Sequence, residues 1–409
     1  MSQENLNDYL YSWNAQPPAH LKTVRIDDDI RDGMQAAFIR RPSLTERKEL
    51  LDLSIKTGTY SIVLGYPAVS PQEYEECLVL LKHVEQQGYD VLPTFLSRLA
   101  VQDLESIVAL NEACPRNRVR AEMFIGTSPL RRKVEGWDFE ANLARIPQVG
   151  KFLNDNNTDF GISLEDGTRA PPQDLDRAIK LALDAGVKDL AICDTVGDCT
   201  PDGAARITEF YMERIAQSGQ DVELVWHGHN DKGLSVANAL ASASAGADTI
   251  SGTFLGIGER AGNTPLEQVI MLLHQAGNEK YNLAAIQPYC EKWSEYADIA
   301  IMPSMPLVGK QAFATGAGTH SAAVLKARKL GIEFEDAVFS SIAARELGRV
   351  QDVVVTPTSG KYNAHYILEQ IGLPPSDQLA SELLEYAKSQ NTWMNGDDIR
   401  RYFAGRGLA

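Results

Sequence analysis

Short apolar runs alternate with longer amphipathic stretches along the first two thirds of the chain. Eight runs rich in β-branched and aromatic residues each predict a β-strand. These strands are expected at 22–26, 60–65, 90–95, 118–124, 158–163, 188–192, 222–227 and 247–252. Between them, stretches such as 44–58 and 175–187 place apolar residues at helical spacing and have a glycine near the end, as helix C-termini often do.

The alternation of strand and helix predicts an α/β fold, a (β/α)₈ TIM barrel that spans residues 22–282. The strand starts lie roughly 25 to 40 residues apart, which is the spacing of repeated βα units. A doubly wound sheet is the alternative. Such a sheet usually carries a glycine-rich dinucleotide-binding loop after its first strand, and no such loop follows the run at 22–26.

The two ends of the chain have a different pattern. Residues 1–21 form a polar lead-in with a Pro-Pro pair near its end, and the segment just after residue 282 is irregular and marked by prolines. Helical patterns then follow at 321–331, 335–347, 363–371 and 377–389. Residues 283–409 are therefore expected to form a mainly helical C-terminal appendage.

Composition narrows the class of protein. The chain has 55 acidic against 39 basic residues and a formal net charge of −16, which argues against a nucleic acid or an anionic membrane as partner. The five cysteines are scattered without a C-x-x-C pair, which fits free thiols in a reducing compartment. Neither a membrane-spanning run nor a signal peptide is recognised. A cytoplasmic enzyme is expected.

The stretch VWHGHNDKGL, residues 225–234, places His227 and His229 two positions apart. Alternate residues of a strand point to the same face, so both imidazoles are aimed at one point. A metal ion needs such an arrangement, but a lone H-x-H pair is as often structural or incidental. The pair therefore needs partners elsewhere in the chain.

Polar residues directly after the predicted strands supply those partners, because the active sites of barrels lie at the C-terminal ends of their strands. These residues are Arg31, Asp32 and Gln35 after the first strand, Glu165, Asp166 and Arg169 after the fifth, Asp194 and Thr195 after the sixth, and Glu259, Arg260 and Asn263 after the eighth. Asp32, His227, His229 and Asn263 together offer a carboxylate, two imidazoles and an amide oxygen. This set suits a divalent Mg, Mn or Zn ion that acts as a Lewis acid on a carbonyl.

Each of these residues also has a structural explanation when it is taken alone. Asp32 could cap a helix or form a turn with the glycine after it. Glu259 and Arg260 could form a salt bridge at the barrel rim, and Asn263 could cap a helix. Their joint placement after strands one, seven and eight favours the metal site.

Three motifs carry a resemblance to a known family. IRDGMQ, HGHNDKGLSVANALASASAGAD and GIGERAGN resemble the acyl-CoA-dependent Claisen-condensing branch of the DRE-TIM metallolyases, which includes 2-isopropylmalate, homocitrate and citramalate synthases. The likeness covers residues 22 to about 330. It implies that Asp32, His227 and His229 hold the metal with Asn263 nearby, that Arg31 polarises a ketone or steadies an enolate, and that Thr195 helps to hold the carboxylate of a 2-oxo acid.

The appendage extends the resemblance. GKQAFATGAGTHSAAVLK is similar to the lid segment of these synthases and places His320 on a histidine implicated in acid–base work, for which an imidazole is suited. A packing or surface histidine is the alternative for His320, and Glu165 is a second candidate for the base. In related enzymes the appendage of one subunit covers the barrel of another, so a homodimer is implied.

Departures from the family pattern bear on the substrate. Asp29 stands where the family favours Thr, and Thr315 stands where the synthases often have His. Val63 stands where the family usually has Glu. Homocitrate synthases carry an Arg at the position of Gly161, so a dicarboxylic 2-oxo acid is disfavoured and an apolar or aromatic one is expected. Gly161 is thus expected to border the substrate. Gln35, Thr195 and Arg169 are expected to bind it.

The resemblance implies a reaction in which acetyl-CoA and a 2-oxo acid give a 2-alkylmalate-type product and free CoA, as in 2-isopropylmalate synthases. A C–C bond lyase of the hydroxymethylglutaryl-CoA lyase type is one alternative, but those enzymes carry a Cys in the loop before the final Asn, and GTFLGIGERAGN has none. A non-catalytic, metabolite-binding relative is the other. The altered lid keeps this second alternative open.

Overall fold

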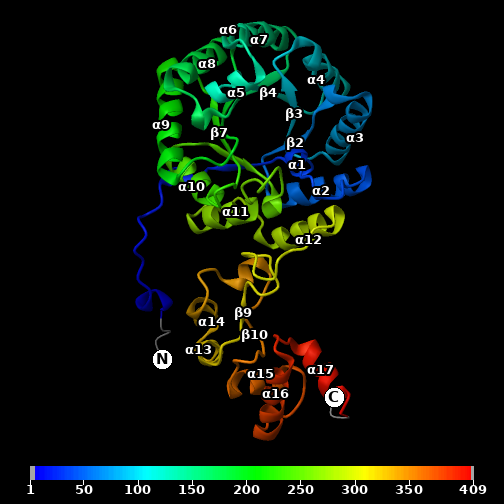
Figure 1. Ribbon diagram of the computed structural model, residues 1–409, viewed down its shortest axis with the longest axis vertical. Helices are drawn as coiled ribbons and strands as arrows, with labels where there is room; N and C mark the ends of the chain where they lie inside the picture. Colours follow the sequence, from blue (N-terminus) through cyan, green and yellow to red (C-terminus); the bar gives the residue numbers. More distant parts are fainter. Residues whose placement is uncertain (1–4, 407–409) are drawn as a thin grey trace. The chain divides into compact units, whose positions relative to one another are not determined.

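Eight parallel strands close into a barrel in the computed structural model, which describes residues 5–406 (Figure 1). The strands are β1 Arg25–Asp28, β2 Ser61–Gly65, β3 Leu92–Arg98, β4 Arg120–Gly126, β5 Asp159–Glu165, β6 Asp189–Asp194, β7 Glu223–Gly228 and β8 Thr249–Gly252. Each strand pairs in parallel with the next, and β8 pairs with β1. The predicted barrel is confirmed, with every strand starting one to three residues later than expected.

Helices follow the strands and lie outside them (Figure 1). They are α1 Ile30–Gly33, α2 Leu44–Thr57, α3 Pro71–Gln87, α4 Val101–Ala113, α5 Pro129–Glu135, α6 Phe139–Leu143, α7 Arg145–Asp155, α8 Pro172–Ala185, α9 Pro201–Ser218, α10 Ser235–Ala245, α11 Leu266–Gln275 and α12 Ile286–Ala297. Local sequence sets their ends. Ser43 and Glu46 form a capping box at the start of α2, and Gly58 ends that helix with φ +98°.

The strands alternate between the two sides of the barrel wall. Apolar side chains such as Ile62, Phe95 and Leu224 are fully buried and face the helices. The residues between them point into the barrel, and many of these are polar. The core therefore lies between strands and helices, which leaves the barrel interior for a polar cavity.

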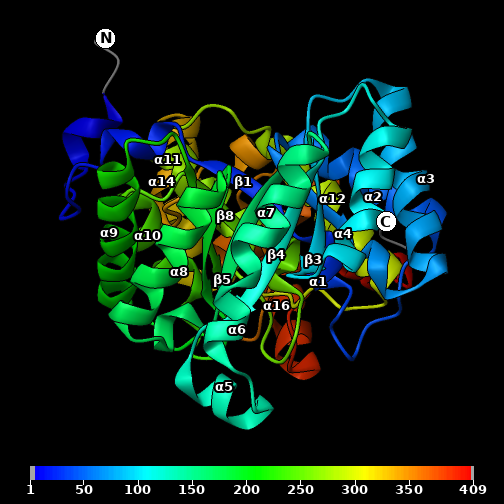
Figure 2. The same cartoon turned by 90° about the horizontal axis from the view of Figure 1, so that it is seen from above.

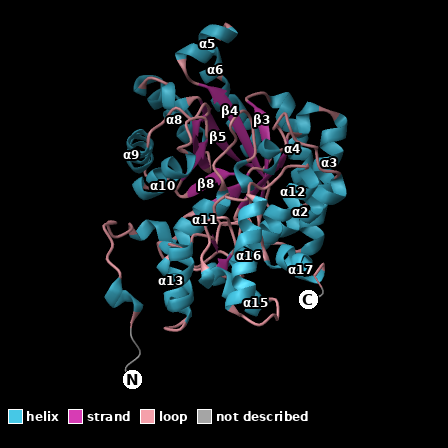
Figure 3. Ribbon diagram, turned by 60° about the horizontal axis from the view of Figure 1, so that its bottom comes forward, coloured by secondary structure: helices cyan, strands magenta, loops and turns pink. Residues whose placement is uncertain are grey.

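Two short helices, α5 and α6, interrupt the regular order between β4 and α7. They project beyond the rest of the barrel in Figures 2 and 3. Ser128 caps α5 by accepting a hydrogen bond from Arg131 N, and Pro129 occupies its first turn. This excursion brings Arg131 to the C-terminal end of the strands.

Helix α12 corrects one expectation from the sequence. Its residues fall in the segment that was expected to be irregular, but they form a twelve-residue helix that packs on α2. Pro288 lies in the first turn of this helix, where its missing N–H would have no intrahelical partner. Tyr289 and Trp293 are buried on one face of α12, and the unit that holds the barrel continues to residue 300.

A second unit contains residues 301–406 together with residues 5–15. Its elements are α13 Gly318–Arg328, α14 Ile332–Val338, α15 Lys361–Gln370, α16 Asp377–Gln390, α17 Gly396–Ala404 and a short sheet of β9 Ala314–Thr315 and β10 Asp352–Val353. Leu368, Leu383 and Phe403 belong to a buried core made by the last three helices. Within residues 5–406, the helices are all too short or too polar to cross a membrane.

Candidate metal and substrate site

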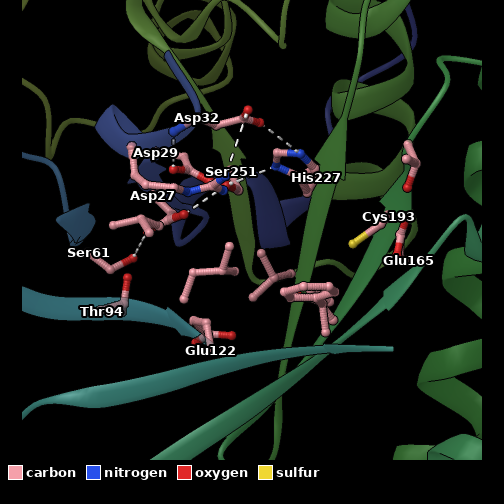
Figure 4. A pocket seen from close by; sticks show the side chains of 18 of the residues that line it. Asp27, Asp29, Asp32, Ser61, Thr94, Glu122, Glu165, Cys193, His227 and Ser251 are labelled. Atoms are coloured by element: carbon pink, nitrogen blue, oxygen red, sulfur yellow. Dashed lines mark hydrogen bonds and ion pairs between the residues drawn. The ribbon is translucent and has the colours of Figure 1, made fainter. Parts of the chain in front are cut away.

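Asp32, His227 and His229 meet at the C-terminal end of the barrel strands. Asp32 lies on α1 just after β1, and the histidines lie at the end of β7 and just beyond it. His227 Nε2 is 3.6 Å and His229 Nε2 is 3.9 Å from Asp32 Oδ2. One donor atom from each residue falls within 4.8 Å of the others. The spacing that the H-x-H pattern suggested is therefore present, and Figure 4 shows Asp32 beside His227.

The charges at this cluster favour metal-binding forms of the three side chains. Burial lowers the pKa of His227, and burial together with its neighbour His227 lowers the pKa of His229 to about 4. Burial opposes ionisation of Asp32, but the nearby Arg31 guanidinium holds its pKa below the usual value. The cluster thus offers neutral imidazoles and a carboxylate, the forms that bind a divalent cation.

Hydrogen bonds behind His227 orient its ring. Ser61 and Ser251 both donate hydrogen bonds of 2.7 Å to the carboxylate of Asp27. Since the Ser251 proton is used in this way, Ser251 Oγ is left to accept from His227 Nδ1, which lies 3.4 Å away. This arrangement directs the lone pair of His227 Nε2 toward Asp32 and His229.

Asn263 lies beside the cluster on the loop between β8 and α11. Its Nδ2 donates to Ile257 O at 3.1 Å, and its backbone bridges to that of His229. Its Oδ1 is buried and lacks a hydrogen-bond partner within the described part of the chain. The loop turns tightly at Gly262, which has φ +91° and where a Cβ would lie 1.9 Å from Gly256 O. An unsatisfied oxygen beside a carboxylate and two imidazoles is a donor set that fits a divalent ion.

Arg31 is held at the mouth of the barrel from two sides. Its Nη2 donates to Asp29 Oδ2 at 2.6 Å, and its Nη1 donates to Gln35 Oε1 at 3.0 Å. The other oxygen of Asp29 accepts from Asp32 N at 2.8 Å and caps α1. Asp29 therefore links the guanidinium to the cluster, and this is the position where the sequence departs from the family's Thr.

Glu165, the last residue of β5, and Thr195, the residue after β6, face the same cavity. Thr195 Oγ1 accepts from Asp166 N at 2.8 Å, which leaves its proton available to donate. Glu165 pairs with Arg131 at 3.2 Å, and burial nevertheless raises the pKa of Glu165 above its usual value. A carboxyl group with such a pKa is suited to proton transfer.

Gln35, Glu259 and Arg260 also line the cavity, whereas Arg169 and Gly161 are not among its lining residues. Arg169 donates two hydrogen bonds to Asp166, whose backbone is left-handed at φ +56°. Gly161 lies on β5, and a Cβ there would come within 2.1 Å of Asp189 Oδ1. The room beside Gly161 is thus filled by the Asp189 carboxylate. His320 belongs to the second unit, where it is exposed and stacks on Phe339 with ring centroids 4.2 Å apart.

The cavity runs from the cluster down into the barrel and has a volume of about 390 Å³ (Figure 4). Sequence reasoning identified its mouth but missed most of its wall. The wall residues it missed include Ser61, Tyr66, Thr94, Leu96, Arg120, Glu122, Phe124, Asp189 and Glu223. Alternating Arg120 and Glu122 inside a strand of a closed barrel was an available signal, because a strand covered by helices can place charges only on its inner face.

A family model and the most similar curated proteins agree on the family of this chain. A family model described as HMGL-like matches residues 23–290. The chain is 30% identical over 373 residues to homocitrate synthase AksA of Methanopyrus kandleri, a match that covers 90% of this chain and 87% of that protein. It is 31% identical over 310 residues to 2-isopropylmalate synthase of Lactococcus lactis, covering 73% of this chain and 58% of the relative. The resemblance drawn from the motifs is confirmed.

Solved structures share the fold at low sequence identity. Hydroxymethylglutaryl-CoA lyase from Pseudomonas aeruginosa superposes with a TM-score of 0.58 at 17% identity, over 69% of this chain and 94% of that one. The enzyme of the same name from Bacillus subtilis gives 0.57 at 18% identity, over 69% and 95%. These likenesses bear on the barrel architecture alone.

Proposed function

Because the chain belongs to the HMGL-like family, we propose that it is an acyltransferase that condenses acetyl-CoA with a 2-oxo acid. The named relatives, which are homocitrate and 2-isopropylmalate synthases, support this reaction type. One acetyl-CoA, one 2-oxo acid and one water give a 2-substituted malate and free CoA. The new C–C bond joins the methyl carbon of the acetyl group to the keto carbon.

The meeting of Asp32, His227 and His229 at the cavity mouth, with Arg31 beside them, is the observation that carries the proposal. These three residues, with Asn263 nearby, would hold a divalent Mg, Mn or Zn ion, which when bound would supply Lewis-acid polarisation of the keto group. Arg31 keeps a fixed positive charge at the same place. In our account it stabilises the negative charge that develops on the keto oxygen.

Two further groups are assigned to substrate orientation. The hydroxyl of Thr195 has a proton free to donate to the carboxylate of the 2-oxo acid, since its oxygen already accepts from Asp166 N. Gln35 faces the cavity and fixes Arg31 through its side-chain oxygen. Its amide group then remains available to the same carboxylate.

Removal of a proton from the acetyl methyl group needs a base, and two residues are candidates. Glu165 lies in the cavity wall, and the raised pKa of its carboxyl group brings it closer to neutral pH, which favours proton transfer. His320 is assigned to acid–base work by the motif of the second unit. Replacing each in turn, as Glu165→Gln and His320→Ala, should separate them through the loss of exchange of the acetyl methyl protons with solvent deuterium.

The cavity wall favours an apolar or aromatic 2-oxo acid over a dicarboxylic one. Val63, Leu96 and Phe124 line the cavity below the cluster. Deeper still, the guanidinium of Arg120 is already paired with Asp189 at 2.8 Å and with Glu223 at 3.2 Å, so it is not free to bind a second carboxylate on the substrate. A 2-oxoglutarate-like substrate is therefore disfavoured.

The test is release of CoA as free thiol from acetyl-CoA in the presence of Mg²⁺ or Mn²⁺. The panel of 2-oxo acids runs from pyruvate through 2-oxoisovalerate and phenylpyruvate to 2-oxoglutarate. We expect release with an apolar or aromatic acid, loss of activity on chelation and loss in His227→Ala. Release with 2-oxoglutarate alone would overturn the substrate assignment, and no release with any acid would overturn the function.

A further inference from the structure

The lower half of the cavity has a polar floor beneath an apolar belt. On five strands, a polar residue that lines the cavity precedes by two positions an apolar residue that also lines it. The polar residue of each pair is therefore nearer the start of its strand. The pairs are Val63 and Ser61 on β2, Leu96 and Thr94 on β3, Phe124 and Glu122 on β4, Ala191 and Asp189 on β6, and Val225 and Glu223 on β7. Along each strand the polar residue lies roughly 7 Å below its apolar neighbour, while between neighbouring strands Val63 is the register partner of Thr94 and Leu96 that of Glu122.

Carboxyl groups outnumber guanidinium groups at this floor. Arg120 Nη1 lies 2.8 Å from Asp189 Oδ2 and 3.2 Å from Glu223 Oε2, and Arg25 pairs with Glu223 at 2.9 Å. Glu122 adds a further carboxyl group next to Asp189. Burial raises the pKa of Glu122 well above its usual value and that of Asp189 to about 6. The two carboxyl groups are thus arranged to share a proton and still expose acceptor oxygens.

Thr94 adds a hydrogen-bonding group that the protein itself does not satisfy. Its side chain lines the cavity although the residue is only 3% exposed. Within the part of the chain that the structure describes, its Oγ1 has no hydrogen-bond partner. Figure 4 shows Thr94 between Ser61 and Glu122. The floor therefore offers one free hydroxyl beside carboxyl acceptors.

A wholly apolar substrate side chain would leave these groups buried without partners, which is unfavourable. The belt, however, excludes a substrate that is polar along its length. We propose that the cavity selects a 2-oxo acid whose side chain is an apolar stem that passes the belt and ends in a hydroxyl group. That hydroxyl donates to Glu122 and accepts from Thr94. The inference rests on the proposed function and specifies its substrate class.

The first test compares matched substrates that differ only in the terminal hydroxyl. We would measure kcat/KM for 4-hydroxyphenylpyruvate and phenylpyruvate with acetyl-CoA. Because phenylpyruvate would leave the buried polar groups of the floor without partners, we expect a preference of about ten- to a hundredfold for the hydroxylated acid. Equal values, or a preference for phenylpyruvate, would overturn the inference.

Variants of the floor identify the groups responsible. Glu122→Met removes the carboxyl group at similar volume, and Thr94→Val removes the hydroxyl with little change of shape. Each should reduce the preference at least fivefold. Thr208→Val makes the same change at a buried threonine between α9 and α10, where Thr208 bonds to Ala204 O and Ser242, and should leave the preference unchanged. An unchanged preference in Thr94→Val and Glu122→Met would contradict the assignment of the floor.

Binding measurements can test the selection of a hydroxyl group by the floor separately from the proposed condensation. Calorimetric binding of the two acids with Mn²⁺, without acetyl-CoA, reports the preference even if no CoA is released. Tighter binding of the hydroxylated acid with no turnover would support selection by the floor and contradict the condensation. Turnover with no preference between the acids would support the condensation and contradict selection by the floor.

Discussion

Asp29 is the residue at which this chain departs most directly from the family motif, and its two carboxylate oxygens have two separate tasks. One oxygen caps α1 through Asp32 N, and the other holds the guanidinium of Arg31. A threonine at this position could provide the cap but not the ion pair. The departure therefore strengthens the positioning of Arg31 and does not disrupt the site.

The variant Asp29→Asn tests this role. Asparagine caps a helix as well as aspartate does, so the thermal unfolding midpoint should change little. Loss of the charge-assisted bond to Arg31 should lower kcat about tenfold. Asp29→Ala is the control, because it also removes the cap and should cost about 1 kcal/mol of stability. A normal kcat in Asp29→Asn would show that Arg31 is held by other contacts.

Ser251 offers a test of the hydrogen bonds behind His227. In Ser251→Ala, Nδ1 of His227 loses its acceptor, and Mn²⁺ affinity measured by calorimetry should fall about ten- to a hundredfold. Ser61→Ala removes the equivalent bond to the other oxygen of Asp27 and should weaken binding less. Equal affinities in both variants and the unchanged protein would contradict this orienting role.

At the scale of single residues, sequence could predict the mouth of the cavity but not its floor. His227, His229 and Asp32 were accessible because strand periodicity and barrel topology bring strand ends together. The charges of Glu122 and Asp189 within their strands could indicate the inner face of the barrel, but not that the two carboxyl groups lie next to each other. Their proximity depends on how the closed barrel brings β4 and β6 to either side of Gly161.

At the scale of elements, the loop between β8 and α11 depends on a buried carboxyl group. Glu267, in the first turn of α11, accepts a hydrogen bond from Leu255 N at 2.9 Å, where the backbone has φ +61°. Burial raises the pKa of Glu267 to about 7. This loop also carries Asn263, so the glutamate supports the geometry of the cluster from behind.

The raised pKa of Glu267 predicts a pH dependence of stability. The unfolded chain releases this proton near pH 4.3 and the folded chain near pH 7, so the folded state binds more protons between these values. Its contribution to stability should fall as pH rises from about 4 to 7, by up to about 1.4 kcal/mol per unit, and then level off. The free energy of unfolding, measured with urea, should decrease less between pH 5 and pH 8 in Glu267→Gln than in the unchanged protein. Glu105→Gln, at an exposed site, is the control, and an equal decrease in the two variants would contradict the role of Glu267.

Element prediction succeeded where the periodicity was strong. The strands were found because buried branched runs recur at regular spacing. In the last third of the chain two helices were not expected: α12, because Pro288 was taken as a breaker although it lies in a first turn, and α17, because only Ile399 and Phe403 mark its buried face. Both are cases in which tertiary packing supplies what local sequence lacks. The helix expected at 335–347 was wrong over most of its length, since α14 ends at Val338.

At the scale of the whole molecule, the chain comprises a barrel unit and a mainly helical second unit. The resemblance assigns lid and dimerisation roles to the helical unit and predicts a homodimer in which the appendage of one subunit serves the barrel of another. Sedimentation should then give twice the chain mass of 44.9 kDa. A monomer at micromolar concentration would contradict the assignment.

Complementation extends this prediction to the active site. His320→Ala and His227→Ala should each be inactive alone, and subunit exchange should restore up to roughly a quarter of the sites if His320 acts on the partner's barrel. A mixture of His227→Ala and Asp32→Asn is the matched control, because both changes lie in one barrel. Recovery in the control, or none in the first mixture, would contradict a shared site.

The fate of the acetyl methyl carbon decides most directly whether this protein condenses acetyl-CoA with a 2-oxo acid. Acetyl-CoA labelled with ¹³C at that carbon would be incubated with Mn²⁺ and the best 2-oxo acid of the panel, and the products would be examined by NMR and mass spectrometry. Condensation should give a labelled CH₂ group bonded to a carbon that carries a hydroxyl group, in a 2-substituted malate formed in equal amount to free CoA. Labelled acetate as the only product would show hydrolysis without condensation and would rule out the proposed reaction.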